Sequence, residues 1–218
     1  MPVARPAADV VDAFAAELDE IESIFASCRG ARSVTGFDIP YMPVEDGCLV
    51  SLWDAWNRFL RSLTLNACSG STLSLSGSTY APVVARTEVE AIAHLVANKK
   101  GKAYNLIEGE PKWFNPAHLS DVMSTLEVDA ALQTSVISAI GATSVALGPV
   151  VIANPLEEVR VCRNFIAHKA RATLAGVQHF AQGPLISLSD HLRDLQAGVE
   201  TFSVWRESMT AIAETAAQ

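Results

Sequence analysis

The strongest constraint on the fold of this 218-residue chain is an apolar repeat with helical spacing in two N-terminal segments. Over 6–27 and again over 48–65, large apolar residues return every three or four positions, which places them on one face of an α-helix. The first segment supplies Val10, Val11, Phe14, Leu18, Ile21, Ile24 and Phe25. The second supplies Leu49, Leu52, Trp53, Trp56, Phe59, Leu60 and Leu63. We therefore expect two amphipathic helices, with a Pro- and Gly-containing loop over 30–47 between them.

Helix start signals predict shorter helices in the rest of the chain. A capping box, S/T-x-x-E, is formed by Thr87 and Glu90, and Asn-Pro pairs at 115–116 and 154–155 place an N-cap residue before a first-turn proline. The predicted helices run over 87–97, 116–126, 129–140 and 155–182, and Gly183-Pro184 ends the longest of them. A last helix, capped by Ser189 or Asp190, is expected to align Leu192, Leu195, Val199, Phe202 and Met209 on one side.

Segment 66–86 differs from its surroundings because serine, threonine and glycine dominate its first half, NACSGSTLSLSGST. It is expected to be an irregular insertion or a short hairpin. It lacks the G-x-x-x-x-G-K-[ST] order of a phosphate loop. Aromatic residues make up only 7% of the chain, which favours helix over sheet. The sequence predicts an all-α bundle in one domain, 1–218, with N-terminal helices over 6–65 and a second helical region over about 110–218.

Charge and cysteine content narrow the class of protein. Lysine and arginine number 16 against 24 acidic residues, so the net charge of −8 does not suit a general nucleic-acid binder, although one local basic site remains possible. The cysteines, Cys28, Cys48, Cys68 and Cys162, form no C-x-x-C pair and no zinc cluster. We expect free thiols in a reducing cytoplasm and no metal. Residues 1–12 lack an apolar signal core, and the weakly polar run 139–153 is too short for a membrane span.

One local basic site lies in the predicted helix 155–182. Its segment 160–171 contains no acidic residue. It carries Arg160, Arg163, His168, Lys169 and Arg171. Arg163-Asn164-x-x-x-His168 resembles the R-x(4–6)-H signature of the HEPN superfamily, in the form with asparagine after the arginine. With Trp113 and Pro116 upstream, the resemblance covers about 110–180 and is to stand-alone HEPN proteins of prokaryotic defence and toxin systems.

The resemblance implies a HEPN-like helical bundle and metal-independent RNA cleavage without a cofactor. The ribose 2′-OH would attack the adjacent phosphorus, so RNA rather than DNA is the expected substrate. The catalytic residues would be His168 as proton donor and acceptor, Arg163 on the phosphorane oxygens, and Asn164 orienting His168 or a phosphate oxygen. Arg160, Lys169 and Arg171 would contact the RNA backbone. A cognate antitoxin or defence partner is also implied.

The five-residue step from Arg163 to His168 turns about 140° around an ideal helix, so the two side chains do not share one face. By contrast, Asn164 and His168 are four residues apart and share one face of the helix. HEPN proteins resemble one another in forming dimers in which two signature helices face each other. The resemblance thus implies a homodimer in which Arg163 and His168 meet across the interface.

Two other hypotheses stay open at this point. One is a catalytically inactive HEPN-like module that dimerises or binds RNA or a nucleotide beside a partner enzyme. The other is a helical adaptor with a coincidental motif, in which Arg163 pairs with Glu157 or Glu158. Position 170 is alanine, where one HEPN subgroup has an aromatic residue. The remaining histidines are expected to be structural or on the surface, and the tryptophans to lie in the core, although base stacking by a tryptophan is an alternative. These are His94, His118, His179, His191, Trp53, Trp56, Trp113 and Trp205.

Overall fold

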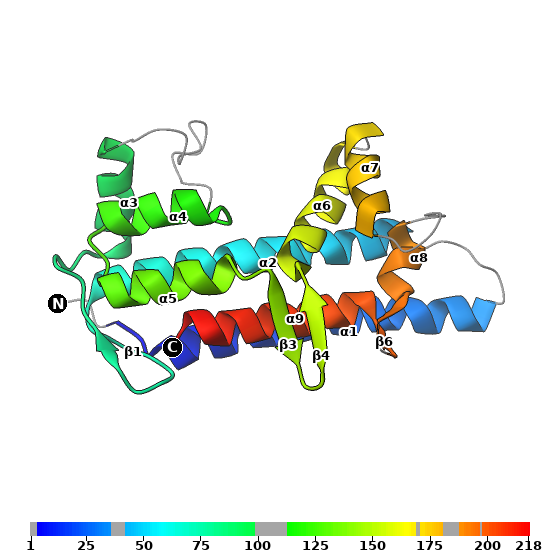
Figure 1. Ribbon diagram of the computed structural model, residues 1–218, viewed down its shortest axis with the longest axis horizontal. Helices are drawn as coiled ribbons and strands as arrows, with labels where there is room; N and C mark the ends of the chain where they lie inside the picture. Colours follow the sequence, from blue (N-terminus) through cyan, green and yellow to red (C-terminus); the bar gives the residue numbers. More distant parts are fainter. Residues whose placement is uncertain (1–3, 36–41, 99–112, 169–170, 181–187, 197) are drawn as a thin grey trace. The chain divides into compact units, whose positions relative to one another are not determined.

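The computed structural model describes residues 4–35, 42–98, 113–168, 171–180, 188–196 and 198–218. Over these ranges the chain is mainly helical, as predicted (Figure 1). The helices are α1 (Ala7–Thr35), α2 (Met42–Ser69), α3 (Glu88–Ala97), α4 (Pro116–Thr125), α5 (Ala130–Ile140), α6 (Pro155–His168), α7 (Arg171–Phe180), α8 (Leu188–Arg193) and α9 (Thr201–Ala216). The strands are β1 (Thr72–Leu73), β2 (Thr79–Tyr80), β3 (Ser144–Leu147), β4 (Val150–Ala153), β5 (Leu195–Gln196) and β6 (Val199–Glu200).

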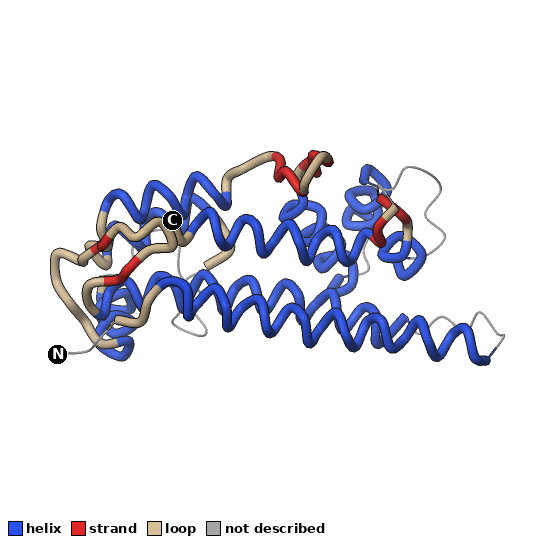
Figure 2. Tube along the Cα trace, turned by 90° about the horizontal axis from the view of Figure 1, so that it is seen from below, coloured by secondary structure: helices blue, strands red, loops and turns tan. Residues whose placement is uncertain are grey.

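Strand in the described ranges is confined to three two-stranded antiparallel hairpins (Figure 2). In β1–β2, Thr72 pairs with Tyr80 and Leu73 with Thr79, so the short hairpin expected within 66–86 is confirmed. Its polar residues Thr72 and Ser74 are buried, whereas Leu73 is 49% exposed. The hairpin β3–β4, register Ser144↔Ala153, was not predicted from the uncharged segment 141–154.

The described chain divides into two compact units. Three of the four divisions fall inside α1, α2 and α9, and the fourth falls between α5 and β3. Unit 1 comprises 1–14, 56–142 and 212–218, and unit 2 comprises 15–55 and 143–211. The expectation of a single domain over 1–218 stays a prediction.

Unit 1 is built around the aromatic face of its parts of α1 and α2. The Phe14 ring stacks on Phe59, with centroids 4.8 Å apart, and lies 5.8 Å from Trp56. The capping box of α3 is present, because Thr87 N–H donates to Glu90 Oε2 at 2.8 Å and Glu90 N–H donates to Thr87 Oγ1 at 3.3 Å. Asn115 caps α4 as predicted, accepting a hydrogen bond from the His118 N–H at 3.2 Å.

Unit 2 contains the segment that carries the basic motif. Phe25 of α1 stacks on Phe202 of α9, with centroids 4.1 Å apart. The guanidinium of Arg193, at the end of α8, lies 4.7 Å above the Phe25 ring and forms an ion pair with Glu45 of α2, which is 0% exposed. This unit therefore has a buried charge pair beside an aromatic stack in its core.

Two details of the predicted N-terminal helices were wrong. The helices extend into the expected loop, because α1 continues to Thr35 and α2 begins at Met42, with Pro43 in its first turn where proline is tolerated. On α1, Ile24 was assigned to the apolar face but is 47% exposed. The other apolar positions predicted for both helices are buried.

The predicted last helix was also wrong. The chain forms α8, then the hairpin β5–β6, and only then α9. Gly198 adopts φ +86°, a left-handed conformation that allows the turn between the strands. As a result, Leu195 and Val199 are 69% and 41% exposed instead of lying on an apolar helix face.

The four cysteines are buried free thiols, as expected. The four tryptophans are also buried, with exposed fractions of 6% or less, so their rings are core residues as predicted. In the described ranges, no helix combines the length and apolarity needed to cross a membrane.

Candidate functional site on helix α6

The basic motif lies on α6, which packs against α7 in unit 2 (Figure 1). The sequence predicted one helix over 155–182, and this was wrong because two helices that lie against each other cannot form one straight helix. Gly176 of α7 permits their close approach, since a Cβ placed on it would lie only 2.9 Å from Val161 Cγ1.

Gly176→Ala is therefore expected to lower the free energy of unfolding by about 1 kcal/mol, because the overlap with the stiff Val161 side chain outweighs the better helix propensity of alanine. Chemical denaturation followed by circular dichroism measures this change. The matched control is the same substitution in a Val161→Ala background, where the obstructing methyl group is gone and Gly176→Ala should instead stabilise the protein. Equal effects in both backgrounds would contradict the packing argument.

Helix α6 begins directly after the β3–β4 hairpin. Pro155 is its first residue, as predicted, but Asn154 adopts φ +48° instead of the extended conformation of an N-cap. Asparagine tolerates this left-handed region better than most residues. Its backbone N–H donates to Thr143 O at 2.7 Å and its carbonyl accepts from Glu158 N–H at 3.0 Å. The role of Asn154 is thus to turn the chain from the hairpin into the helix.

The two acidic residues of the first turn have different partners. Glu157 is exposed and holds Arg160 in a bidentate ion pair, with Nε–Oε2 at 2.7 Å and Nη2–Oε1 at 2.5 Å. Glu158 is 6% exposed and accepts a hydrogen bond from Trp205 Nε1 of α9 at 2.9 Å. Burial raises the pKa of the Glu158 carboxyl, and the Trp205 hydrogen bond opposes this. Neither carboxylate pairs with Arg163, so that part of the adaptor hypothesis does not hold.

Arg163 is partly buried one turn further along α6. Its Nε is shielded from solvent and has no hydrogen-bond partner among the described residues. Burial also raises the pKa of the neighbouring Cys162 thiol well above its usual range, and Glu158 adds to the effect. Cys162 is therefore a protonated apolar residue, which agrees with its assignment as a structural position.

The other two proposed catalytic residues lie toward the C-terminal end of α6. Asn164 is partly buried, and His168, the last residue of the helix, is exposed. In the described part of the chain no hydrogen bond connects these two side chains. The structure therefore places all three residues on one helix but does not by itself join them into a constellation.

The proposed RNA-binding residues are placed only in part. Arg160 is held by Glu157, so contact with a phosphate would require exchange of that carboxylate. Lys169 lies outside the described residues. Arg171 begins α7, and its side chain also lies outside the described part.

Glu158, His191 and Trp205 form a buried polar cluster that was not predicted from the sequence. The available signal was the spacing of Glu158 with Pro155, Val159 and Cys162, which places it on the buried face of α6. In the adaptor hypothesis, Glu158 was instead a possible partner of Arg163.

The described residues contain no group of three or more His, Cys, Asp or Glu side chains that could hold a metal ion. The chain matches no protein-family model, no curated protein and no solved structure.

Proposed function

We propose that the protein is a metal-independent, HEPN-type endoribonuclease whose active site is formed by two copies of α6. The observation that carries this proposal is the state of Arg163. Its guanidinium is partly shielded from water and has no carboxylate partner among the described residues, because Glu157 and Glu158 are engaged by Arg160 and Trp205. An unpaired, shielded guanidinium suits an anion, and the same helix ends in an exposed imidazole.

The chemistry needs no group beyond the side chains of α6 and the RNA. His168 removes the proton of a ribose 2′-OH, whose oxygen attacks the adjacent phosphorus. Arg163 donates hydrogen bonds to the phosphorane oxygens, where negative charge builds up in the transition state. A protonated imidazole then returns a proton to the departing 5′-oxygen, which leaves a 2′,3′-cyclic phosphate and a 5′-OH. Asn164 orients His168 or holds a phosphate oxygen.

A homodimer supplies the geometry that one helix lacks. Arg163 and His168 lie about 140° apart around α6, so in a two-fold dimer the arginine of one copy would face the histidine of the other. The α6–α7 pair supports this arrangement, because several large apolar side chains on it stay partly exposed in the single chain. They are Phe165, Ile166, Leu174 and Phe180.

The wider assignment is to a toxin or antiphage effector that cuts cellular RNA in the cytoplasm. Lys169 and Arg171 would contact the RNA backbone, with Arg160 joining them by exchanging Glu157 for a phosphate. A cognate antitoxin or defence partner would control the activity. This part of the proposal is supported by the sequence resemblance alone.

The test is incubation of the purified protein with a labelled RNA in excess EDTA. Cleavage is expected to continue unchanged and to yield 2′,3′-cyclic phosphate ends, because a proton-transfer mechanism does not use a metal. A matched RNA with one 2′-deoxy nucleotide should resist cleavage at that nucleotide. Loss of activity in EDTA with recovery in Mg²⁺, or cleavage at the deoxy position, would reject the mechanism.

The second candidate is a catalytically inactive module that dimerises through α6 and α7 beside a partner enzyme. The observation that favours it is the absence of a hydrogen bond between Asn164 and His168 in the described structure. A stable dimer by light scattering that binds RNA but never cuts it would support this candidate. A monomer that neither binds nor cuts RNA would leave only the helical-adaptor hypothesis.

A further inference from the structure

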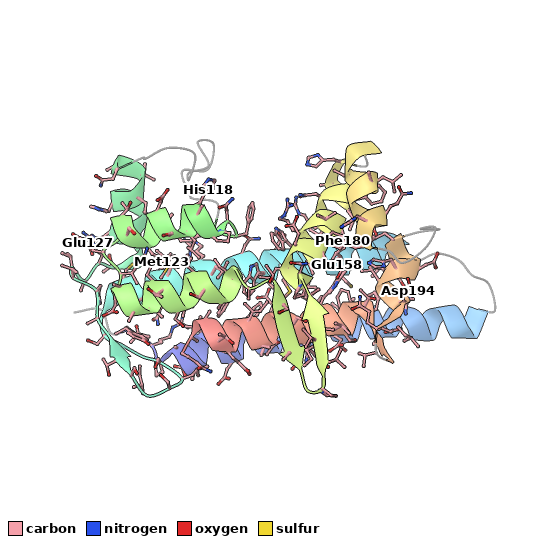
Figure 3. All side chains as sticks on the ribbon, in the orientation of Figure 1. His118, Met123, Glu127, Glu158, Phe180 and Asp194 are labelled. Carbon is pink, nitrogen blue, oxygen red and sulfur yellow. The ribbon has the colours of Figure 1, made fainter. Side chains whose placement is uncertain are left out.

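Three helices of unit 2 meet at a buried polar cluster that the proposed cleavage does not use. Glu158 comes from α6, His191 from α8 and Trp205 from α9. Their exposed fractions are 6%, 4% and 0%, so these polar groups have almost no access to water. Figure 3 labels Glu158 on α6, and Asp194, which follows α8.

The cluster is connected but not fully satisfied. The indole N–H of Trp205 donates to Glu158 Oε2 at 2.9 Å, and the His191 ring meets the Trp205 ring edge-on with centroids 5.8 Å apart. Nε2 of His191 lies 3.8 Å from Glu158 Oε1, too far for a hydrogen bond but close enough for strong electrostatic coupling. Both ring nitrogens of His191 are buried without a hydrogen-bond partner among the described residues.

No fixed cation balances this cluster in the described part of the chain. Asp194 faces the other side of the imidazole, with its Oδ2 3.7 Å from Nδ1, but it is largely exposed. On α6, the Cys162 thiol stays protonated and Arg160 is neutralised by Glu157. Arg163, about 140° around the helix from Glu158, forms no ion pair with it in the described structure. Arg193 of α8 pairs with Glu45 and Glu200, and Arg206 of α9 pairs with Asp19 and Glu22. Among the described residues, His191 is thus the one basic side chain with a nitrogen within 4 Å of the Glu158 carboxylate.

Charge counting then limits the protonation of the pair. A lone buried carboxylate or a lone buried imidazolium is strongly unfavourable in a site with so little water. With one proton shared between them, the pair is neutral overall, whichever group carries the proton. With two protons the site holds a cation, and with none it holds an anion.

We propose that Glu158 and His191 share a single proton inside the fold and form a pH-sensitive contact that fixes α6 to α8 and α9. Addition of a second proton in acid, or loss of the shared one in base, weakens this contact. The proposal concerns the conformation of α6 and stands whether or not the protein cuts RNA.

The two groups shift stability in opposite directions with pH. Burial raises the pKa of Glu158, so its contribution alone falls as the pH rises above the ordinary carboxyl pKa. Burial lowers the pKa of His191, an effect that Asp194 opposes, so its contribution alone falls as the pH drops below the ordinary imidazole pKa. Together the two groups give a maximum of stability between the ordinary pKa of a carboxyl group and the ordinary pKa of an imidazole.

The test is the urea unfolding equilibrium of Glu158→Gln, His191→Gln and the double variant between pH 5.5 and 7.5. Relative to the double variant, Glu158→Gln should unfold up to about tenfold more readily at pH 5.5 than at pH 7.5, because an unfolded histidine binds a proton there and the buried one does not. His191→Gln should show the opposite trend. Glu207→Gln, which removes an exposed carboxylate of α9 in the same unit, is the matched control and should follow the wild type. If the unfolding equilibrium of both single variants depends on pH in the same way as that of the double variant, the proposal is wrong.

A second measurement does not depend on the folding of these variants. In the wild-type protein with ¹³C-labelled histidine rings, the His191 ring should keep the shifts of its pH 7.5 state over this range, because burial lowers its pKa. The indole N–H resonance of Trp205 should likewise stay in place until the pair gains or loses a proton. A His191 ring that titrates with an ordinary midpoint, without any change at Trp205, would contradict the shared proton.

Discussion

Replacing His168 with alanine is expected to reduce RNA cleavage by about 10²–10⁴-fold, the usual contribution of a general acid–base group. Arg163→Ala should cost about 10²–10³-fold, because the developing phosphorane charge loses its donor. Single-turnover rates with labelled RNA measure both losses, and circular dichroism checks that the helices remain. His179→Ala is the matched control, since His179 is an exposed histidine on the adjoining α7 and should retain wild-type rates.

A mixing experiment distinguishes a shared site from a site within one chain. A heterodimer of Arg163→Ala and His168→Ala contains one intact pairing of arginine with the partner's histidine. An equal mixture should therefore recover about a quarter of wild-type activity if subunits exchange at random. Full activity in both single variants would reject the assignment of these residues. Inactive singles with no recovery on mixing, despite subunit exchange, would place both groups in the same subunit.

The second large effect is expected at the buried ion pair of unit 2. Arg193→Met should lower the free energy of unfolding by about 3–5 kcal/mol, because Glu45 stays fully buried after the guanidinium is lost. The same substitution removes the cation from the Phe25 ring and from Glu200, whose Oε1 lies 3.6 Å from Arg193 Nη1. Urea denaturation at neutral pH gives the difference directly.

Two controls separate burial of charge from loss of packing. Arg206→Met breaks an ion pair with Asp19, which is 60% exposed, and should cost only about 1 kcal/mol or less. The double variant Glu45→Met/Arg193→Met removes both charges and should recover most of the stability. If the double variant is as unstable as Arg193→Met alone, the loss comes from packing and the electrostatic explanation fails.

The capped helices were predictable because their signals are local. Thr87 with Glu90, and Asn115 with Pro116, satisfy backbone groups within one turn and need no distant partner. The apolar faces of α1 and α2 were predictable for a similar reason, since a long amphipathic repeat has one favourable way to bury itself.

The division of 155–182 into α6 and α7 was not predictable in this way. The residues around the break, Lys169-Ala170-Arg171, are all good helix formers. Instead, α6 and α7 pack closely where Val161 meets Gly176. This is a tertiary contact, which the helix propensities of single residues do not predict. Gly198 was a weak indication that the predicted last helix is interrupted before α9. An isolated glycine is also tolerated within helices, so it did not predict the hairpin.

The sequence identified the candidate site, but it did not indicate the ion-pair and hydrogen-bond partners of the side chains there. Spacing placed Arg163, Asn164 and His168 on one helix. The engagement of Glu157 by Arg160, and of Glu158 by Trp205, depends on which acid of the first turn faces inward. Trp205 is 47 residues beyond Glu158, so no local pattern connects them.

The buried residues of α6, namely Pro155, Glu158, Val159 and Cys162, all lie in its first eight positions, and none follows. The last turns, where residues 163–166 are only partly buried, are therefore the part of α6 that opens at the lowest energetic cost. Contact with a second molecule would oppose such opening. In the proposed homodimer, assembly and the alignment of the terminal imidazole would thus be coupled, and dilution of the protein would disable the proposed site before any helix unfolds elsewhere.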